Sequence, residues 1–397
     1  MRALLSTIGS RGDVQPMVAL ALQLRTLGHE ARICAPPDFR SWIEGFGIQF
    51  FPIGPEVTST AKPSAPPTPE QVRAMMEGTV VTQFETIPHA AEGCDVIVAG
   101  NAINVAARSV AEQMGIAYVF ATYCPVTLPS EHHAPPKVMA WTQDTTVDNL
   151  TQWADDATRW NERWGSALNS QRAARGLAPV SNVRDHVLSD EPLVAADATL
   201  APWPGSAQLD VFQTGAWILQ DDRPLSAELE AFLDTGEPPI YFGFGSIRAP
   251  QDLSRTMIES ARASGRRVIM SRGWADLSLV DAQPDCLSIG DVNQQSLFKR
   301  VAAVVHHGGA GTTTAAARAG APQVVIPQHY DQHYFAHRVS ELGIGSAHPP
   351  VAPTTESLSH ALAHALQHEV TTRAQSISGA VRSDGALVAA QRLIHYT

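Results

Sequence analysis

The 397-residue sequence has few cysteines, no cluster of positive charge and no long apolar run. Its four cysteines are scattered without metal-binding or redox spacing, so we expect reduced thiols in a cytoplasmic protein. The net charge of −11, with no basic run, argues against nucleic acid or an anionic membrane as the main partner. No apolar stretch is long enough to span a bilayer, so peripheral contact is the most membrane association we expect.

What the sequence does contain is a repeated alternation of short apolar runs and amphipathic stretches. Such alternation is typical of parallel β-sheets with helices on both faces. It predicts one helix over residues 14–27, ending at Gly28, and another near residues 105–114. The predicted strands cover residues 2–7, 30–35, 48–52, 95–100, 117–122, 239–244, 267–271, 286–289, 302–305 and 323–326.

The chain is too long for one ordinary core, and its composition changes near the middle. Residues 200–224 are rich in Pro, Gly and Asp, and the strand–helix alternation restarts after them. We therefore predict an α/β protein with two doubly wound, Rossmann-like domains that face each other across a cleft. The predicted parts are an N-terminal domain (1–205), a linker (206–224), a C-terminal domain (225–380) and a last helix (381–397), for which a return to the N-terminal domain is one option.

The strongest local signal is the stretch VAAVVHHGGAGTTTAAARAG at residues 301–320, where an apolar strand runs into a glycine-rich turn and a helix. Glycines let the backbone approach an anion closely, and the free N–H groups at a helix start favour negative charge. A second glycine turn, YFGFGS at residues 241–246, follows the first strand of the same half. Two such turns predict a diphosphate held from both sides. The alternative for each is a tight strand-to-helix connection.

With these turns, the sequence resembles the family 1 glycosyltransferases of the GT-B fold, and most of all the enzymes that glycosylate glycopeptide-antibiotic aglycones. The resemblance covers nearly the whole chain. It is carried by STIGSRGDVQP, TGAWILQDDRPLSAELEAFLD, FGFGS, SRGWADL, HHGGAGTT and PQHYDQ. It implies that the N-terminal domain binds an acceptor and that the C-terminal domain binds a nucleotide-sugar donor.

In the family's donor signature, a histidine precedes the glycine turn and an Asp-Gln pair follows 24 residues later. His307, Asp331 and Gln332 match this spacing. The resemblance implies that Asp331 and Gln332 bind the donor sugar. It implies diphosphate contacts for Ser10, Ser246, His307, Gly308, Gly309, Gly311 and Thr312. Nucleobase or ribose contacts are implied for Arg272, Trp274, Val292 and Gln294.

Two positions depart from the family's pattern. The tryptophan that often stacks on the nucleobase is missing from the aligned segment GDVNQQSLF, and Trp274 is a candidate replacement. The glutamate that often binds the ribose hydroxyls is replaced by Ala315. Loss of that carboxylate removes one reason to require a 2′-hydroxyl. A TDP-sugar is therefore as plausible a donor as a UDP-sugar.

The resemblance also implies an inverting transfer, which needs a base at the acceptor and charge stabilisation at the leaving diphosphate. The glycine turn and helix start supply the second, so we expect neither a metal ion nor a cofactor. Asp13 is the first candidate for the base, at the position where many relatives carry a catalytic histidine. Asp331 is the second. The alternative for Asp13 is a structural role as N-cap of the helix over residues 14–27.

Histidines in the stretch QHYDQHYFAH permit a competing interpretation as a metal site. His329, His333 and His337 have the i, i+4, i+8 spacing of one helical face. No companion metal motif accompanies them, and the first of them is predicted to lie in a loop. We therefore favour a role in lining the cleft.

Aromatic residues before residue 165 also permit two interpretations. Trp153, Trp160 and Trp164 fit one face of a helix packed on the core, or an aromatic wall for a flat acceptor. The irregular segment 125–143, with His132 and His133, is the better candidate for acceptor contacts because it follows a strand end.

These features predict an enzyme that moves a hexose, first of all glucose, from a UDP- or TDP-sugar to an aromatic natural product. A glycopeptide heptapeptide is the first choice of acceptor, and macrolides, sterols or other polyketides are the alternatives. Two other classes stay open: a non-catalytic nucleotide-sugar-binding regulatory partner and a nucleotide-sugar epimerase. We expect a monomer or a weak dimer.

Overall fold

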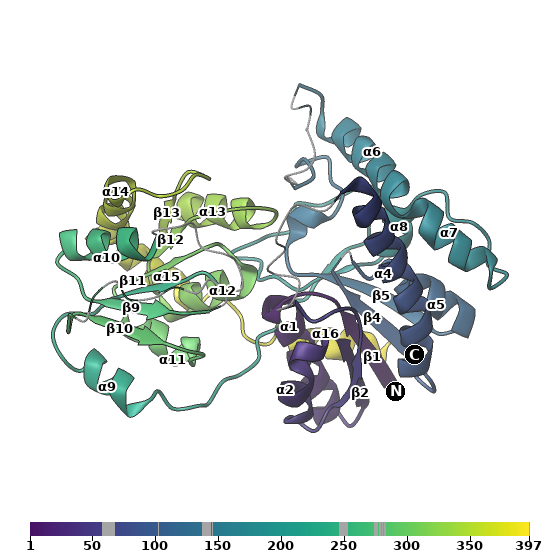
Figure 1. Cartoon of the computed structure of the whole chain (residues 1–397), viewed down its shortest axis with the longest axis horizontal. Helices are drawn as coiled ribbons and strands as arrows, with labels where there is room; N and C mark the ends of the chain where they lie inside the picture. The colour runs from purple at the N-terminus through teal and green to yellow at the C-terminus, as the bar shows by residue number, and fades with distance from the viewer. Residues whose placement is uncertain are drawn as a thin grey trace.

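Two α/β domains lie side by side in the computed structural model of this chain (Figure 1). The structure describes residues 1–57, 68–101, 103–136, 144, 146–245, 253–273, 277, 279, 281 and 283–396. Two residues with predicted donor contacts, Ser246 and Trp274, lie outside the described residues, as do residues 137–143 of the predicted acceptor segment.

The N-terminal domain is built on a parallel sheet of seven strands in the order β3-β2-β1-β4-β5-β6-β7. All five strands predicted here are present, with ends that agree within one residue. Every residue of β4 is buried, as expected for a strand covered on both faces. The strands are β1 Arg2–Thr7, β2 Glu30–Ala35, β3 Gln49–Pro52, β4 Val96–Gly100, β5 Ala117–Thr122, β6 Leu193–Val194 and β7 Phe212–Gln213.

Helices cover both faces of this sheet (Figure 1). Helix α6 follows the segment 125–143, because Asp148 caps the helix and its apolar residues recur at helical spacing. Trp153 and Trp164 are buried, which confirms the core interpretation for these two. The helices are α1 Arg11–Thr26, η1 Pro37–Phe39, α2 Arg40–Glu44, α4 Pro69–Ala90, α5 Ala107–Met114, η2 Pro125–Thr127, α6 Asn149–Trp160, η3 Asn161–Gly165, α7 Ser166–Ala173 and α8 Val183–Leu188.

The C-terminal domain has a parallel sheet of six strands in the order β10-β9-β8-β11-β12-β13. Its strands are β8 Ile240–Gly243, β9 Val268–Ser271, β10 Cys286–Ile289, β11 Ala303–His306, β12 Gln323–Val325 and β13 Gly345–Ala347. Its helices are α9 Ala227–Leu233, α10 Leu253–Ala263, α11 Gln294–Leu297, η4 Phe298–Arg300, α12 Ala310–Ala319, α13 Gln332–Glu341, α14 Thr355–Ala365 and α15 His368–Ser378, and the last helix of the chain is α16 Gly385–Ile394. Among the described helices, none is long and apolar enough to cross a bilayer.

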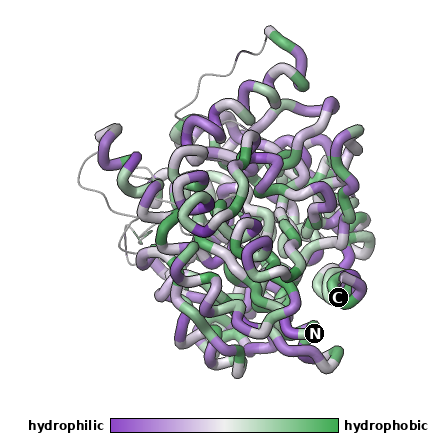
Figure 2. The backbone as a smooth tube through the Cα atoms, turned by 90° about the vertical axis from the view of Figure 1, so that its right-hand side faces the viewer, coloured by the Kyte–Doolittle hydropathy of each residue, from purple (hydrophilic) through white to green (hydrophobic). Residues whose placement is uncertain are grey.

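The crossing between the sheets starts later than the predicted linker. Strand β7 lies inside residues 206–224 yet pairs with β6, because two residues suffice for a ladder that composition does not reveal. Helix α16 then returns to pack on α1, and both termini lie at the N-terminal domain (Figures 1 and 2). The return brings Gly385 against Gly215 so closely that a Cβ on Gly385 would lie 2.3 Å from the Gly215 carbonyl carbon.

Each sheet contains one point where the strand order reverses. In the N-terminal sheet it lies between β1 and β4, and in the C-terminal sheet between β8 and β11. Ligands of open parallel sheets bind at the carboxyl ends of the strands beside such a reversal. The candidate base follows β1 and the glycine turn follows β11, so both lie at these positions.

Candidate active site

Asp13 lies in the first turn of α1, at the carboxyl end of β1. The helix begins at Arg11 with Ser10 as its N-cap, so the prediction that Asp13 itself is the N-cap is wrong by three positions. Serine is a strong N-cap residue, and Arg11 and Gly12 are accommodated in the first turn. The Asp13 carboxylate instead accepts the Ser10 N–H at 2.8 Å and its hydroxyl at 3.3 Å. Ser10, predicted to contact the diphosphate, thus binds Asp13.

The Asp13 carboxylate is held close to the protein backbone. A Cβ on Gly9 would lie 2.2 Å from Asp13 Oδ2, so residue 9 has to be glycine for the carboxylate to lie there. The amide of Asn101 donates to Oδ1 at 3.2 Å, and the hydroxyl of Tyr123 donates to the Asp13 carbonyl oxygen at 2.9 Å. Burial raises the pKa of Asp13, and the hydrogen bonds from Asn101 and Ser10 oppose that rise.

The glycine turn after β11 leads into the start of helix α12 at the carboxyl end of the strand. Gly309 is the N-cap of α12, and the first internal bond joins the Thr313 N–H to the Gly309 carbonyl at 3.0 Å. The N–H groups of Ala310, Gly311 and Thr312 therefore have no partner within the helix. They lie where the sequence predicts an anion, and free N–H groups of this kind favour negative charge.

His306, which the sequence interpretation missed, holds this turn in place. Its buried ring accepts the Gly308 N–H at Nδ1 (3.0 Å), which leaves Nε2 to donate to Gln323 Oε1 (2.9 Å). Burial lowers the pKa of His306 to about 4, so the ring is neutral. The Gly308 N–H is thus engaged and is not free for the predicted diphosphate contact.

Gly308 allows the turn to form because of its backbone conformation. Its φ of 94° is one that residues with side chains rarely adopt. A Cβ there would lie 2.8 Å from Val325 Cγ1 and 3.0 Å from the Gln332 carbonyl oxygen. The glycine turn therefore packs directly on the backbone of Gln332.

His307 lies between the two glycine turns. A Cβ on Gly245 would lie 3.2 Å from its Cε1, and a Cβ on Gly309 would lie 2.6 Å from its Nε2. Its buried Nδ1 has no hydrogen-bond partner among the described residues. Burial, followed by the nearby His306 and His329, lowers the pKa of His307 to about 3. A neutral ring with an unpartnered nitrogen is suited to hydrogen-bond a ligand.

Gln332 and Asp331 mark the start of α13, beyond the end of β12. The side-chain oxygen of Gln332 accepts the N–H groups of Gln328 at 2.9 Å and His329 at 3.3 Å, so its NH₂ end is the end available to a ligand. Tyr330, just before the pair, has a φ of 57°, which is strained for a bulky residue.

Asp331 and Asp13 come from different domains and interact electrostatically. Burial raises the pKa of Asp331 to about 7, and the negative charge of Asp13 contributes to the rise. The pKa of Tyr330 is also raised, first by burial and then by nearby Asp331, Asp156 and Cys124. The loop before α13 therefore lies close enough to the N-terminal domain for the charges of the two candidate bases to interact.

The three histidines around this loop do not share a helical face. His329 lies in the turn before α13, and His333 and His337 lie on the helix. The His337 ring nitrogen is 3.7 Å from Glu341 Oε2. The i, i+4, i+8 spacing therefore does not place the three histidines on one helical face, and the geometric argument for a metal site is lost.

Residues predicted to bind the nucleobase or ribose follow β9 and β10. Arg272 is exposed, and the Gln294 amide donates to the Tyr241 hydroxyl at 3.4 Å. Val292 is partly buried beside the domain core. A Cβ on Gly273 would lie 2.6 Å from the Gly245 carbonyl oxygen, so the segment after β9 packs against the glycine turn that contains Gly245.

On the acceptor side, His133 packs between aromatic rings. Its ring centroid is 5.8 Å from that of Trp153 and 6.3 Å from that of Trp203, and the Trp153 indole donates to the His133 carbonyl. His132 is exposed. Of the two predicted acceptor histidines, His132 is the one with a solvent-facing side chain.

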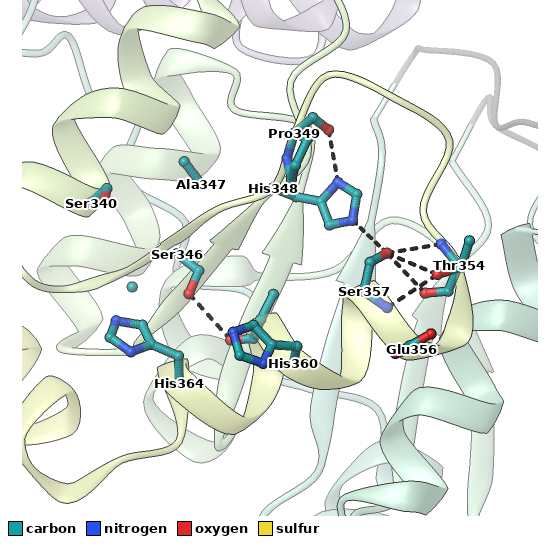
Figure 3. Close-up of a pocket in the computed structure, with 12 residues that line it drawn as sticks. Ser340, Ser346, Ala347, His348, Pro349, Thr354, Glu356, Ser357, His360 and His364 are labelled. Carbon is teal, nitrogen blue, oxygen red and sulfur yellow. Dashed lines mark hydrogen bonds between the residues drawn. The ribbon is translucent and has the colours of Figure 1, made fainter.

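A separate groove of about 630 Å³ lies at the β13 edge of the C-terminal sheet (Figure 3). His348 in its wall is already engaged, with Nδ1 donating to the Pro349 carbonyl at 2.8 Å and Nε2 2.9 Å from Ser357 Oγ. No residue of the two glycine turns or of the Asp-Gln pair lines this groove. The groove is therefore distinct from the site described above.

Comparison with known proteins decides the family. A model described as the glycosyltransferase family 28 N-terminal domain matches residues 3–132, and one described as the erythromycin biosynthesis protein CIII-like C-terminal domain matches residues 255–386. The vancomycin aglycone glucosyltransferase of Amycolatopsis orientalis is 50% identical over 396 residues, spanning 99% of this chain and 97% of that protein. The chain belongs to the family 1 glycosyltransferases. Membership confirms the predicted family and enzyme class.

One further relative and one solved structure are also similar to this family 1 glycosyltransferase. The dTDP-epi-vancosaminyltransferase of Amycolatopsis orientalis is 44% identical over 385 residues, spanning 95% of this chain and 93% of that protein. The solved structure of glycosyltransferase VinC in complex with dTDP superposes with a TM-score of 0.69, covering 100% of this chain and 99% of that one at 19% identity. The structural likeness confirms the GT-B fold.

Proposed function

We propose that this family 1 glycosyltransferase moves a hexose from a UDP- or TDP-sugar to a hydroxyl of a glycopeptide aglycone, with inversion at the anomeric carbon. The observation that carries the proposal is the glycine turn, where the free N–H groups of the α12 start and the His307 Nδ1, unpartnered among the described residues, lie next to Gln332. Asp331, beside Gln332, interacts electrostatically with Asp13 of the other domain. The names of the two relatives support it, because one acts on the vancomycin aglycone and the other takes its name from a dTDP-sugar.

In the proposed mechanism Asp13 takes the proton of the acceptor hydroxyl. The hydroxyl oxygen attacks the anomeric carbon, and the bond from that carbon to the diphosphate breaks. The negative charge that develops on the leaving diphosphate is met by the free N–H groups of the α12 start and by His307. Asp331 and the Gln332 amide hold the sugar hydroxyls while the bond changes.

The proposal is tested by incubating the purified enzyme with UDP- and TDP-hexoses and with aromatic aglycones, and by reading the products by mass spectrometry. We expect one hexose added to a glycopeptide aglycone. Conversion of the donor without any acceptor would instead indicate an epimerase. Donor binding without turnover of either substrate would indicate a regulatory partner.

Metal independence is a second expected result. The N–H groups of Ala310, Gly311 and Thr312 make no hydrogen bond within the helix, so they are free to stabilise the negative charge of a diphosphate. Turnover should therefore keep its rate after dialysis against EDTA. A metal-dependent glycosyltransferase assayed in the same buffer serves as control, and recovery of lost activity by added Mg²⁺ or Mn²⁺ would contradict the expectation.

The cytoplasmic localisation and the oligomeric state of the enzyme stay predictions.

A further inference from the structure

Asn101 lies at the carboxyl end of β4, directly across the strand-order reversal from the base. Its neighbour Gly100 is paired with Thr7, the last residue of β1. Asn101 has a φ of 61°, which asparagine tolerates better than most residues other than glycine. The chain thus turns sharply at this residue and brings its side chain back over the end of β1.

The side chain of Asn101 joins three parts of the turn after β1. Its Nδ2 donates to the Ile8 carbonyl at 2.7 Å, to Thr7 Oγ1 at 3.3 Å and to Asp13 Oδ1 at 3.2 Å. Its Oδ1 accepts the Ile103 N–H at 3.1 Å. Because Oδ1 is taken by a backbone donor, the amide can present only its NH₂ end to Asp13.

We propose that Asn101 is a positioning residue for the glycosyl transfer, and that its amide holds the Asp13 carboxylate in the direction needed to receive the acceptor proton. The inference rests on the proposed function, in which Asp13 is the base. Ser10 donates to Oδ2 from one side and Asn101 to Oδ1 from the other. The carboxylate is therefore held at both of its oxygens.

The amide also acts on the charge of Asp13. A hydrogen bond to the ionised form favours ionisation, so Asn101 keeps the base available at lower pH. The other titratable groups around Asp13 are Tyr123 from the end of β5 and Tyr330 and Asp331 from the loop before α13. On its own helix, Arg11 is directed away, toward Gln15 at 3.2 Å and Asp291 at 3.5 Å.

Two substitutions at position 101 distinguish the effect of the side-chain amide from the effect of the backbone conformation. Asn101→Gly keeps the positive φ and removes the donor, whereas Asn101→Asp keeps the shape and places a second carboxylate against the base. We expect Asn101→Gly to lower kcat about 10- to 100-fold, a part of the ~10²–10⁴-fold that a general base contributes. The acidic limb of the kcat–pH profile should move to higher pH in Asn101→Gly and further in Asn101→Asp. The donor KM should stay unchanged.

A matched control comes from Asn169, whose side chain makes a similar pair of backbone bonds to Val180 at 2.9 and 2.7 Å. It lies on α7, on the side of the N-terminal domain away from the donor domain (Figure 1). Asn169→Asp should lower thermal stability without moving the pH profile. The measurements are kcat and KM against pH, with the melting temperature of every variant.

The Asp13→Asn variant distinguishes failure of this inference from failure of the proposed function. If Asp13→Asn lowers kcat but Asn101→Gly, still folded, changes neither kcat nor the pH profile, the positioning role is overturned and the base stands. If Asp13→Asn leaves kcat unchanged, the base assignment fails first. Asn101→Gly added to Asp13→Asn should cause no further loss, because Asn101 acts through Asp13. A fully multiplicative loss would overturn the inference.

Discussion

Replacement of Asp13 by Asn is expected to lower kcat by about 10²–10⁴-fold, the contribution of a positioned general base. The change removes the atom that receives the acceptor proton. It leaves the start of α1 intact, because the Asn side-chain oxygen can still accept the Ser10 N–H that Asp13 accepts at 2.8 Å. The donor-binding turns lie on the other domain, so donor affinity should stay the same.

The measurement is kcat with saturating substrates, together with the donor Kd from calorimetry and the melting temperature. Asp190→Asn is a suitable control, because Asp190 is an exposed aspartate of the same domain. Unchanged turnover in Asp13→Asn, with normal folding, would remove Asp13 as the base. Asp331 would then be the remaining carboxylate in the cleft.

The acidic side of the pH profile provides a second readout of the same base. Burial raises the pKa of Asp13 above its ordinary range, so kcat should fall as the pH drops through that raised value and level off above it. The negative charge of Asp13 raises the pKa of Asp331, whereas the causes that shift the pKa of Asp13 are burial and its own hydrogen bonds. Asp331→Asn should therefore lower turnover through loss of a sugar contact and leave the acidic limb of Asp13 in place.

The second large effect is expected from His307→Ala. We expect kcat/KM to fall by about 10²–10³-fold, the loss seen when one donor to a developing anion is removed. The ring fills the space between Gly245 and Gly309, and its Nδ1 has no partner among the described residues. Both its hydrogen bond and its packing are then lost from the diphosphate site.

His307→Gln separates these two contributions. A glutamine amide can donate and accept, so it should recover part of the activity, whereas loss of packing alone predicts no recovery. Because the pKa of His307 is about 3, the ring is neutral in the working range, and the loss in His307→Ala should be the same at every neutral pH. His337→Ala, an exposed position on α13, should retain activity. Donor affinity and kcat/KM unaffected by His307→Ala would contradict the assignment.

Much of the fold follows from local pattern. The ten predicted strands are all present, and four of them agree with the structure to the residue: β1, β2, β5 and β10. Buried parallel strands are continuous apolar runs, which single-sequence reasoning can detect. Strands β6 and β7, with two residues each, carry no such signal. Helix α6 was only one of two interpretations of its tryptophans, because the prolines upstream obscure the helical period that begins at Asp148.

The predicted donor half of the site came from two kinds of sequence signal. The family resemblance supplied the 24-residue spacing of His307 and Asp331, and the glycines that follow His307 indicate an anion turn on physical grounds. Asn101 and His306 escaped notice for different reasons. Asn101 acts on a residue 88 positions away, and His306 looks like a repeat of His307 until its ring is found buried under the turn. The position of Asn101 at the end of an apolar strand was the available signal.

By itself, the sequence determined which residues lie at strand ends, because apolar periodicity and glycines act over short distances along the chain. It also determined the family, through motifs spread over nearly all of it. Only the tertiary structure decided which strand ends are neighbours. The pairing of β1 with β4 places Asn101 on Asp13, and the docking of the C-terminal domain brings Asp331 close enough to interact with the charge of Asp13. The physical reason is that hydrogen bonds and charge repulsion depend on distances in space, which parallel pairing and domain docking set and local pattern does not record.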